Sequence, residues 1–380
     1  MSYKNKESQK YEEYWKFTAA KTDFENLLFI EGLSTIINRI DNNDAYFYKD
    51  SKKPSSYNKL QESLVEINGW NSKDPYANAR KEINTWVKLG FIEPELQNYH
   101  PSAKNFIESQ SKFERDTLRA KIFLDNNKFG ASVSKQDDCK TNRVKFLIDT
   151  LQKNGKLSKN ELLGIMFTDP DDYDGSLNAE QLKDKVNEIN KIGALERKYN
   201  QLSHLKSALK CLDQYIVFIN DEMHFRDDDN EIQQISRSKD KKPRSQIQQS
   251  VYRDELIIES NRIMGESEDN SRCKCMLTGL SMSKSKIVAS HIWHYRMCDA
   301  ESEYDSNNGL LLGENADYYF DSGKISFSDE GVVLIGDDVP VEWENYFNGY
   351  KLNKVFLNAK RKDYLSKHRK IHNFLDTRTC

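Results

Sequence analysis

Three polar residues in apolar surroundings give this 380-residue chain its clearest chemical signal. His291 lies in the string Ala-Ser-His-Ile, Asn308 opens Asn-Gly-Leu-Leu-Leu, and Asp317 opens Asp-Tyr-Tyr-Phe-Asp. The pattern predicts a strand that ends at His291, then a turn at Asn308 and a second strand, and then a short helix from Glu314 to Asp321. A β-hairpin followed by a helix can direct a base and an acidic ligand at one metal ion.

These residue types suit the hydrolysis of a phosphodiester bond. The reaction needs a base that activates water, and a cation that stabilises charge on the phosphate and on the departing 3′-oxygen. A neutral imidazole titrates near physiological pH, so His291 suits the role of the base. The alternative is that His291 is a structural histidine and that Asn308 only forms an Asn-Gly turn.

Four sequence words occur in order around these residues. They read Cys-Met-Leu-Thr-Gly from Cys275, Ala-Ser-His-Ile from Ala289, Asp-Ser-Asn-Asn-Gly-Leu-Leu-Leu from Asp305, and Phe-Asp-Ser-Gly-Lys-Ile-Ser-Phe from Phe320. In this order and at this spacing, the words resemble those of the HNH nucleases, also called ββα-metal nucleases. The resemblance covers about residues 252–372.

The resemblance implies a role for each residue. It makes His291 the general base, and it gives Asn308 the task of fixing the loop and orienting the histidine. Asp317 occupies the family's third position, often a histidine or asparagine, where a carboxylate suits Mg²⁺, with Mn²⁺ as a substitute. Asp321 lies one helical turn later on the same face, as a second ligand or as a residue that orients the hairpin. His294 is assigned to the surface or to a phosphate contact.

The six cysteines do not form the paired Cys-x-x-Cys knuckles that hold zinc in many HNH proteins. Cys273, Cys275 and Cys298 are an alternative zinc set, but the spacing of the first two does not suit a knuckle. We therefore expect no structural zinc, and a reduced, cytoplasmic location. No apolar run approaches the roughly twenty residues that cross a membrane, so we expect no membrane partner.

The net charge of −3 does not exclude DNA as a partner, because the basic residues are unevenly distributed. Residues 351–371 are rich in Lys and Arg and hold one acid, Asp363. Such a stripe suits a phosphate backbone or, alternatively, forms a solvated helix face. The predicted DNA contacts in this stripe are Lys360, Arg361, Lys367 and Arg369.

The region before the nuclease words is predicted to be helical. Ser-Lys-Asp-Pro at 72–75 starts a helix whose polar face presents Asn78, Lys81 and Lys88 to a DNA groove. Further on, Gly155 ends one helix, and Ser158 starts the next through a capping box. In each of the two predicted modules a helix ends at a glycine, Gly90 in the first and Gly193 in the second, and continues into a short apolar segment, which is the pattern of a winged helix.

The sequence therefore predicts a mostly helical α+β protein, with two winged-helix-like modules before a C-terminal ββα-metal domain. An acidic run followed by a basic, proline-ended stretch predicts a linker between them. The predicted boundaries are 1–107 for the first module, 108–140 for a helical connector, 141–226 for the second module, 227–250 for the linker and 251–380 for the nuclease domain.

This layout resembles type II restriction endonucleases that separate recognition from cleavage. We expect a site-specific endonuclease that acts on double-stranded DNA with one metal ion per site. Because one HNH site cuts one strand, we expect a homodimer or a transient dimer on DNA. Two alternatives stay open. The first is a modification-dependent enzyme that reads methylated cytosine, and the second is a non-enzymatic winged-helix regulator with a relic HNH domain.

Overall fold

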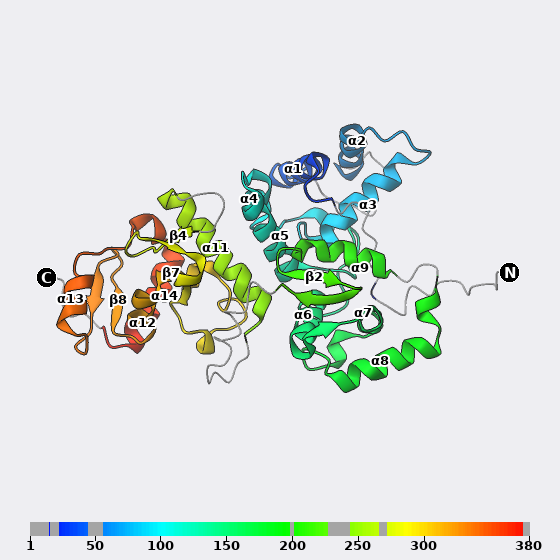
Figure 1. Ribbon diagram of the computed structural model, residues 1–380. Coiled ribbons are helices and arrows are strands. Elements are labelled where there is room, and N and C mark those ends of the chain that lie inside the picture. Colours follow the sequence, from blue (N-terminus) through cyan, green and yellow to red (C-terminus); the bar gives the residue numbers. More distant parts are fainter. Residues whose placement is uncertain are drawn as a thin grey trace. The chain divides into compact units, whose positions relative to one another are not determined.

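The computed structural model describes residues 15, 23–44, 56–197, 201–226, 244–265 and 272–374 (Figure 1). The chain divides into two compact units, Met1–Asp227 and Asp228–Cys380. Helices dominate and the sheets are small, as predicted for a mostly helical α+β protein. Within the described ranges, no helix is both long enough and apolar enough to cross a membrane. Most of the predicted linker, residues 227–243, lies outside the described residues.

The first half of unit 1 is helical. Its helices are α1 (Leu27–Asp41), α2 (Ser56–Asn68), α3 (Pro75–Lys88), α4 (Ala103–Glu108) and α5 (Lys112–Asn126). As predicted, α3 begins with proline in its first turn, and the Asp74 side chain accepts a hydrogen bond from the Ala77 amide. Trp86 of α3 is fully buried, and its ring meets that of Phe29 of α1.

The short strand predicted after α3 is reduced to one bridge between Ile92 and Tyr99. Gly90 has a φ of +89°, and its Cα lies against the backbone of Asn126, where an added Cβ would meet a carbonyl oxygen at 2.5 Å. The Asn126 side chain also donates to the Gly90 carbonyl. The segment thus packs on the end of α5 instead of pairing with a strand, and residues 56–126 contain no β-hairpin.

The second half of unit 1 combines helices with a small sheet. Its elements are α6 (Arg143–Asn154), β1 (Lys156–Leu157), α7 (Lys159–Met166), α8 (Ala179–Lys191), α9 (Leu202–Leu209), β2 (Ile216–Ile219) and β3 (Glu222–Phe225). Gly155 ends α6, and Ser158 and Glu161 form the predicted capping box of α7. The strands are antiparallel in the order β1-β3-β2, so the β2–β3 hairpin pairs with the short strand between α6 and α7.

Unit 2 begins with a long helix and continues with two-stranded sheets. Its elements are α11 (Gln246–Met264), β4 (Arg272–Lys274), β5 (Ser281–Ser283), β6 (Ile287–His291), β7 (Gly309–Gly313), α12 (Glu314–Asp321), β8 (Ile325–Phe327), β9 (Val333–Ile335), α13 (Val341–Phe347) and α14 (Ala359–Ile371). Helix α11 begins inside the range that the sequence assigned to the linker. It packs on β7, where Gly309 leaves room for the Tyr252 hydroxyl, which an added Cβ would meet at 2.2 Å.

Candidate active site

Strands β6 and β7 form an antiparallel pair that leads directly into α12. His291 is the last residue of β6 and lies opposite Gly309, the first residue of β7. Every residue of β7 is buried, which explains its uninterrupted apolar run. The ββα arrangement predicted around His291 is therefore present, and it brings the end of β6 close to α12.

His291 is held between two tyrosine rings. Tyr252 of α11 stacks on it with 4.6 Å between ring centroids, and Tyr295 makes a T-shaped contact at 5.5 Å. The His291 Nε2 atom lies 2.8 Å from the Glu303 carbonyl oxygen. Because a carbonyl oxygen only accepts hydrogen bonds, this contact assigns the proton to Nε2 and leaves the lone pair of neutral imidazole on Nδ1. Burial lowers the pKa of His291 to about 4, against a partly compensating effect of the Glu303 carbonyl.

Asn308 is fully buried and fastens the loop between β6 and β7. Its Oδ1 accepts from the Trp293 amide at 2.7 Å, and its Nδ2 donates to the carbonyls of Trp293 at 3.1 Å and Ser302 at 3.0 Å. Its own carbonyl accepts from the Tyr252 hydroxyl at 3.0 Å. The same loop carries Glu303, so the contacts of Asn308 fix the backbone to which His291 donates.

The two carboxylates of α12 differ in their surroundings. Asp317 is partly buried, and burial raises its pKa to about 6, with a smaller contribution from the negative charge of Asp321. The Ser290 hydroxyl and the positive charge of Arg244 oppose this rise. Asp321 is 67% exposed, and its Oδ1 lies 3.8 Å from His294 Nδ1.

The donors at this site fit a hard divalent cation. Asp317 and Asp321 repel one another, so a cation between them would relieve an unfavourable interaction. Ser290 Oγ is buried and makes no hydrogen bond of ordinary length to the described residues, although it affects Asp317. Carboxylate and hydroxyl oxygens are the donors that Mg²⁺ and Mn²⁺ accept. Sequence reasoning passed over Ser290, although its place directly before His291 was a usable signal.

The cysteines considered for zinc are buried and are not joined in a disulfide within the described residues. In the part of the chain that the structure describes, the one group of three His, Cys, Asp or Glu ligand atoms within 4.8 Å of one another is Cys139, Asp169 and Asp171 in unit 1. Cys273, Cys275 and Cys298 do not form such a group among those residues. Asp171 accepts hydrogen bonds from the amides of Lys140 and Thr141, so the unit 1 cluster is also part of a turn.

His294, predicted to lie at the surface or to contact a phosphate, lies near Asp321, and two further histidines without a predicted role, His368 and His372, lie next to it. His294 Nε2 is 3.0 Å from His372 Nε2. His368 is buried and stacks on Phe320 with 4.2 Å between centroids, while its Nδ1 contacts the Ser326 hydroxyl. His368 is therefore a packing residue, whereas His294 and His372 lie at the edge of the site.

The structure buries two of the predicted DNA contacts. The Lys88 ammonium donates to the Phe129 carbonyl at 2.6 Å, so it does not reach a groove. Arg361 is 1% exposed, and its guanidinium pairs with Glu259 at 2.8 Å and donates to the Ser306 carbonyl. The prediction that Lys88 and Arg361 contact DNA is therefore wrong, for the same reason in each case. Each long side chain turns into the protein and donates to a buried acceptor.

The other predicted DNA contacts remain at or near the surface. On α3, Lys81 is exposed and Asn78 is partly exposed. On α14, Lys360 is exposed and Lys367 is partly exposed, and they pair with Asp305 and Asp363. Arg369 is 19% exposed and pairs with Asp329. Part of the basic stripe of α14 thus braces the loop before β7, since Lys360 and Arg361 both hold residues just ahead of Asn308.

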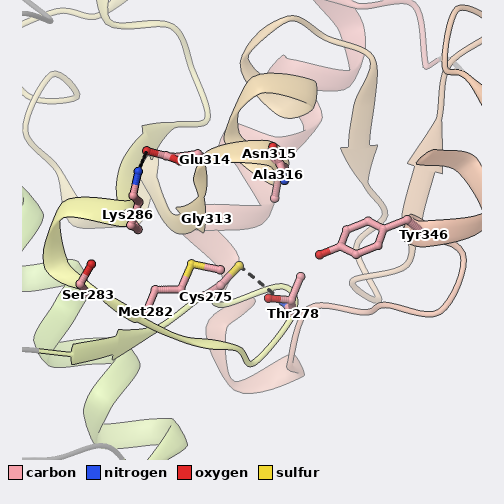
Figure 2. Close-up of a pocket in the computed structure, with 10 residues that line it drawn as sticks. All are labelled: Cys275, Thr278, Met282, Ser283, Lys286, Gly313, Glu314, Asn315, Ala316 and Tyr346. Atoms are coloured by element: carbon pink, nitrogen blue, oxygen red, sulfur yellow. Dashed lines mark hydrogen bonds and ion pairs between the residues drawn. The ribbon is translucent and has the colours of Figure 1, made fainter. Parts of the chain in front are cut away.

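A cavity of about 310 Å³ opens at the other end of the β6–β7 pair. Figure 2 shows its lining from the loop after β4, from β5, from the start of α12 and from α13. Lys286 and Glu314 form an ion pair at its rim, and Tyr346 points its hydroxyl toward it. Gly313 lines the cavity and pairs with Ile287, whereas His291 pairs with Gly309. The cavity therefore lies apart from the candidate active site.

Comparison with known protein families gives one match. Residues 275–328 match the family model described as HNH endonuclease. No curated protein matches the chain significantly. The matched range contains the β6–β7 pair and all of α12, together with His291, Asn308 and Asp317. It supports an HNH nuclease in unit 2, a class that acts on DNA and typically uses a divalent metal.

Proposed function

We propose that the chain is a site-specific DNA endonuclease that hydrolyses phosphodiester bonds at the β6–β7–α12 site. The observation that carries the proposal is an oriented, neutral His291 at the end of β6, a strand that packs on the helix carrying Asp317 and Asp321, within the segment that matches HNH endonucleases. The type II restriction role rests on the large helical unit that precedes this segment and on the resemblance described above.

Asp317 and Asp321 would hold one divalent cation, Mg²⁺ or Mn²⁺, with the Ser290 hydroxyl close to Asp317. When bound, such an ion supplies a positive charge for the phosphate and for the 3′-oxygen as it departs. The protein prepares this position by placing two negative charges on one face of α12. A carboxylate in the third position of the motif therefore fits an oxygen-ligated ion.

His291 would take a proton from the attacking water through Nδ1, the ring nitrogen that does not donate to Glu303. A bond then forms between the water oxygen and phosphorus, and the bond between phosphorus and the 3′-oxygen breaks. The negative charge of an approaching phosphate favours the protonated imidazole, so it raises the low pKa that burial gives His291 in the free protein. Asn308 contributes by fixing the loop that carries Glu303.

Unit 1 would supply the recognition of DNA sequence. The second half of this unit has the helices α6 to α9 and a β2–β3 hairpin that pairs with β1, an arrangement that supports a winged-helix role. Exposed polar residues of α3, such as Lys81, are further candidates for DNA contact. Because one nuclease site cuts one strand, cutting both strands would need two copies of the chain or two successive cuts.

Plasmid cleavage tests the proposal directly. The purified chain is incubated with Mg²⁺ and with supercoiled plasmid that is either unmethylated or cytosine-methylated, and the ends are mapped by run-off sequencing. We expect nicking followed by cutting at defined positions in the unmethylated plasmid, and no cutting by His291→Ala. Cutting of methylated plasmid alone would support the modification-dependent alternative. DNA binding without any cutting would support the alternative of a non-enzymatic winged-helix regulator with a relic HNH domain.

A further inference from the structure

Arg244 lies just ahead of α11, outside the segment that matches the HNH endonuclease model. Its guanidinium stands over the ring of Tyr295, with Cζ 4.7 Å from the ring centroid. Tyr295 in turn makes the T-shaped contact with the ring of His291. One aromatic ring thus connects a permanently charged guanidinium with the candidate base.

A chain of hydrogen bonds fixes the backbone next to Arg244. The Ser245 amide donates to the Tyr304 hydroxyl at 2.9 Å, and the hydroxyls of Tyr304 and Tyr295 are 3.0 Å apart. Tyr304 follows Glu303, whose carbonyl accepts from His291. The same short loop therefore positions both the imidazole of His291 and the segment that carries Arg244.

The positive charge of Arg244 acts on both sides of the candidate site. It opposes the rise that burial causes in the pKa of Asp317, the candidate metal ligand, and it adds to the fall that burial causes in the pKa of His291. Burial affects each pKa more than the charge of Arg244 does. The position of Arg244 is therefore taken from its contact with the Tyr295 ring and from the hydrogen bonds of the neighbouring backbone.

We propose that Arg244 is a further catalytic residue of this site and that its guanidinium contacts a non-bridging oxygen of the phosphate that is cleaved. The planar guanidinium donates parallel hydrogen bonds to phosphate oxygens, a geometry that an ammonium group does not reproduce. Negative charge on the phosphate grows as the water attacks, so the contact strengthens toward the transition state. This inference rests on the proposed nuclease function and deepens it.

The test compares Arg244→Gln and Arg244→Lys with the control Arg272→Gln. Arg272 is an exposed arginine of the same unit, and Ser281 holds its side chain. The first readout is the rate of plasmid nicking with Mg²⁺. We expect Arg244→Gln to slow nicking by roughly 100- to 1000-fold and Arg244→Lys by about tenfold or more. Arg272→Gln should stay within about twofold of the unmodified protein.

A second readout separates this inference from the nuclease proposal. Thymidine 3′,5′-bisphosphate is titrated calorimetrically into each protein with Ca²⁺ present. Arg244→Gln should bind it about tenfold or more weakly, because a charged hydrogen bond is lost, while Arg272→Gln should bind it as the unmodified protein does. If the unmodified protein does not nick plasmid, the nuclease proposal fails, and this titration alone decides whether Arg244 binds phosphate.

Two results would overturn the role of Arg244. One is an Arg244→Gln protein that nicks plasmid and binds the bisphosphate like the unmodified chain. The other is an Arg244→Lys protein with unchanged nicking and binding, because lysine keeps the charge over Tyr295 but not the planar donor pair. The folding of both variants is checked by thermal melts. If Arg244→Gln does not fold, the nicking rate and bisphosphate affinity of Arg244→Lys decide whether Arg244 contacts the phosphate.

Discussion

Replacing Asp317 with asparagine should make the metal-free protein more stable at neutral pH. Burial raises the pKa of this carboxyl from 3.8 to about 6. The folded state therefore holds the proton more tightly than the unfolded state, and the carboxyl costs no stability below about pH 3.8. Its cost grows as the pH rises from 3.8 to 6 and is complete above pH 6. Asparagine keeps the shape of the side chain and removes the charge.

The magnitude follows from that pKa difference. About 1.4 kcal/mol per pKa unit gives an upper limit of roughly 3 kcal/mol at pH 7.5. Because Asp317 is only partly buried, solvent screening reduces the cost, and we expect about 1–2 kcal/mol. This corresponds to an increase in Tm of about 2–8 °C for a unit of this size. At pH 4.5 the difference should fall to about one third, because the folded carboxyl is then almost fully protonated and no longer carries a buried charge.

Scanning calorimetry in EDTA measures the increase in Tm of Asp317→Asn at pH 7.5 and the smaller increase at pH 4.5. Glu314→Gln is the matched control, because Glu314 lies on the same helix and is 58% exposed, so its replacement should not raise Tm. Adding Mn²⁺ should stabilise the unmodified protein and not Asp317→Asn, with a gain of about 2.7 kcal/mol at 100 times Kd. An asparagine variant that is less stable in EDTA at pH 7.5, or a stability difference that does not shrink on acidification, would refute the reasoning.

Three other predictions follow from the same contacts. His291→Ala should slow cleavage by roughly two to four orders of magnitude while DNA affinity, measured by fluorescence anisotropy, stays unchanged; wild-type cutting would remove His291 from the mechanism. Asn308→Ala should destabilise unit 2 by about 2–4 kcal/mol in calorimetry, because the Trp293 amide and the Ser302 carbonyl lose buried partners, whereas the exposed Asn315→Ala should cost far less. EDTA should abolish cleavage without a large fall in Tm, and stoichiometric zinc in a metal analysis would contradict the absence of a cysteine site.

The secondary structure of the candidate site could be predicted because each element depends on residues that are neighbours in the sequence. Gly309 and the leucines after it indicate a buried strand, and Glu314 to Asp321 form the predicted helix. The caps of α3 and α7 are also local, since each depends on side chains within one helical turn. Such signals do not require knowledge of which distant segments meet.

The parts that the sequence did not predict depend on distant contacts. Tyr252 packs on a histidine far along the chain, and nothing in the sequence around Tyr252 indicates this. Arg361 looked like a surface cation within a basic stripe, yet Glu259 of α11 pairs with it in the interior. The strand expected after α3 failed similarly, because Gly90 packs on Asn126 rather than beside a partner strand.

The carboxylate at position 317 and the arginine at position 244 form one electrostatic arrangement. A histidine at position 317 would bind metal while neutral, so it would add no charge to a partly buried position. Aspartate adds a negative charge there, next to that of Asp321, and a cation that offsets both charges would stabilise the site. The positive charge of Arg244 opposes the rise in the pKa of Asp317, and in the proposed site a metal ion would supply the remaining compensation. In the proposed site an anionic phosphate would then meet two positive groups, so the two carboxylates would not prevent it from binding.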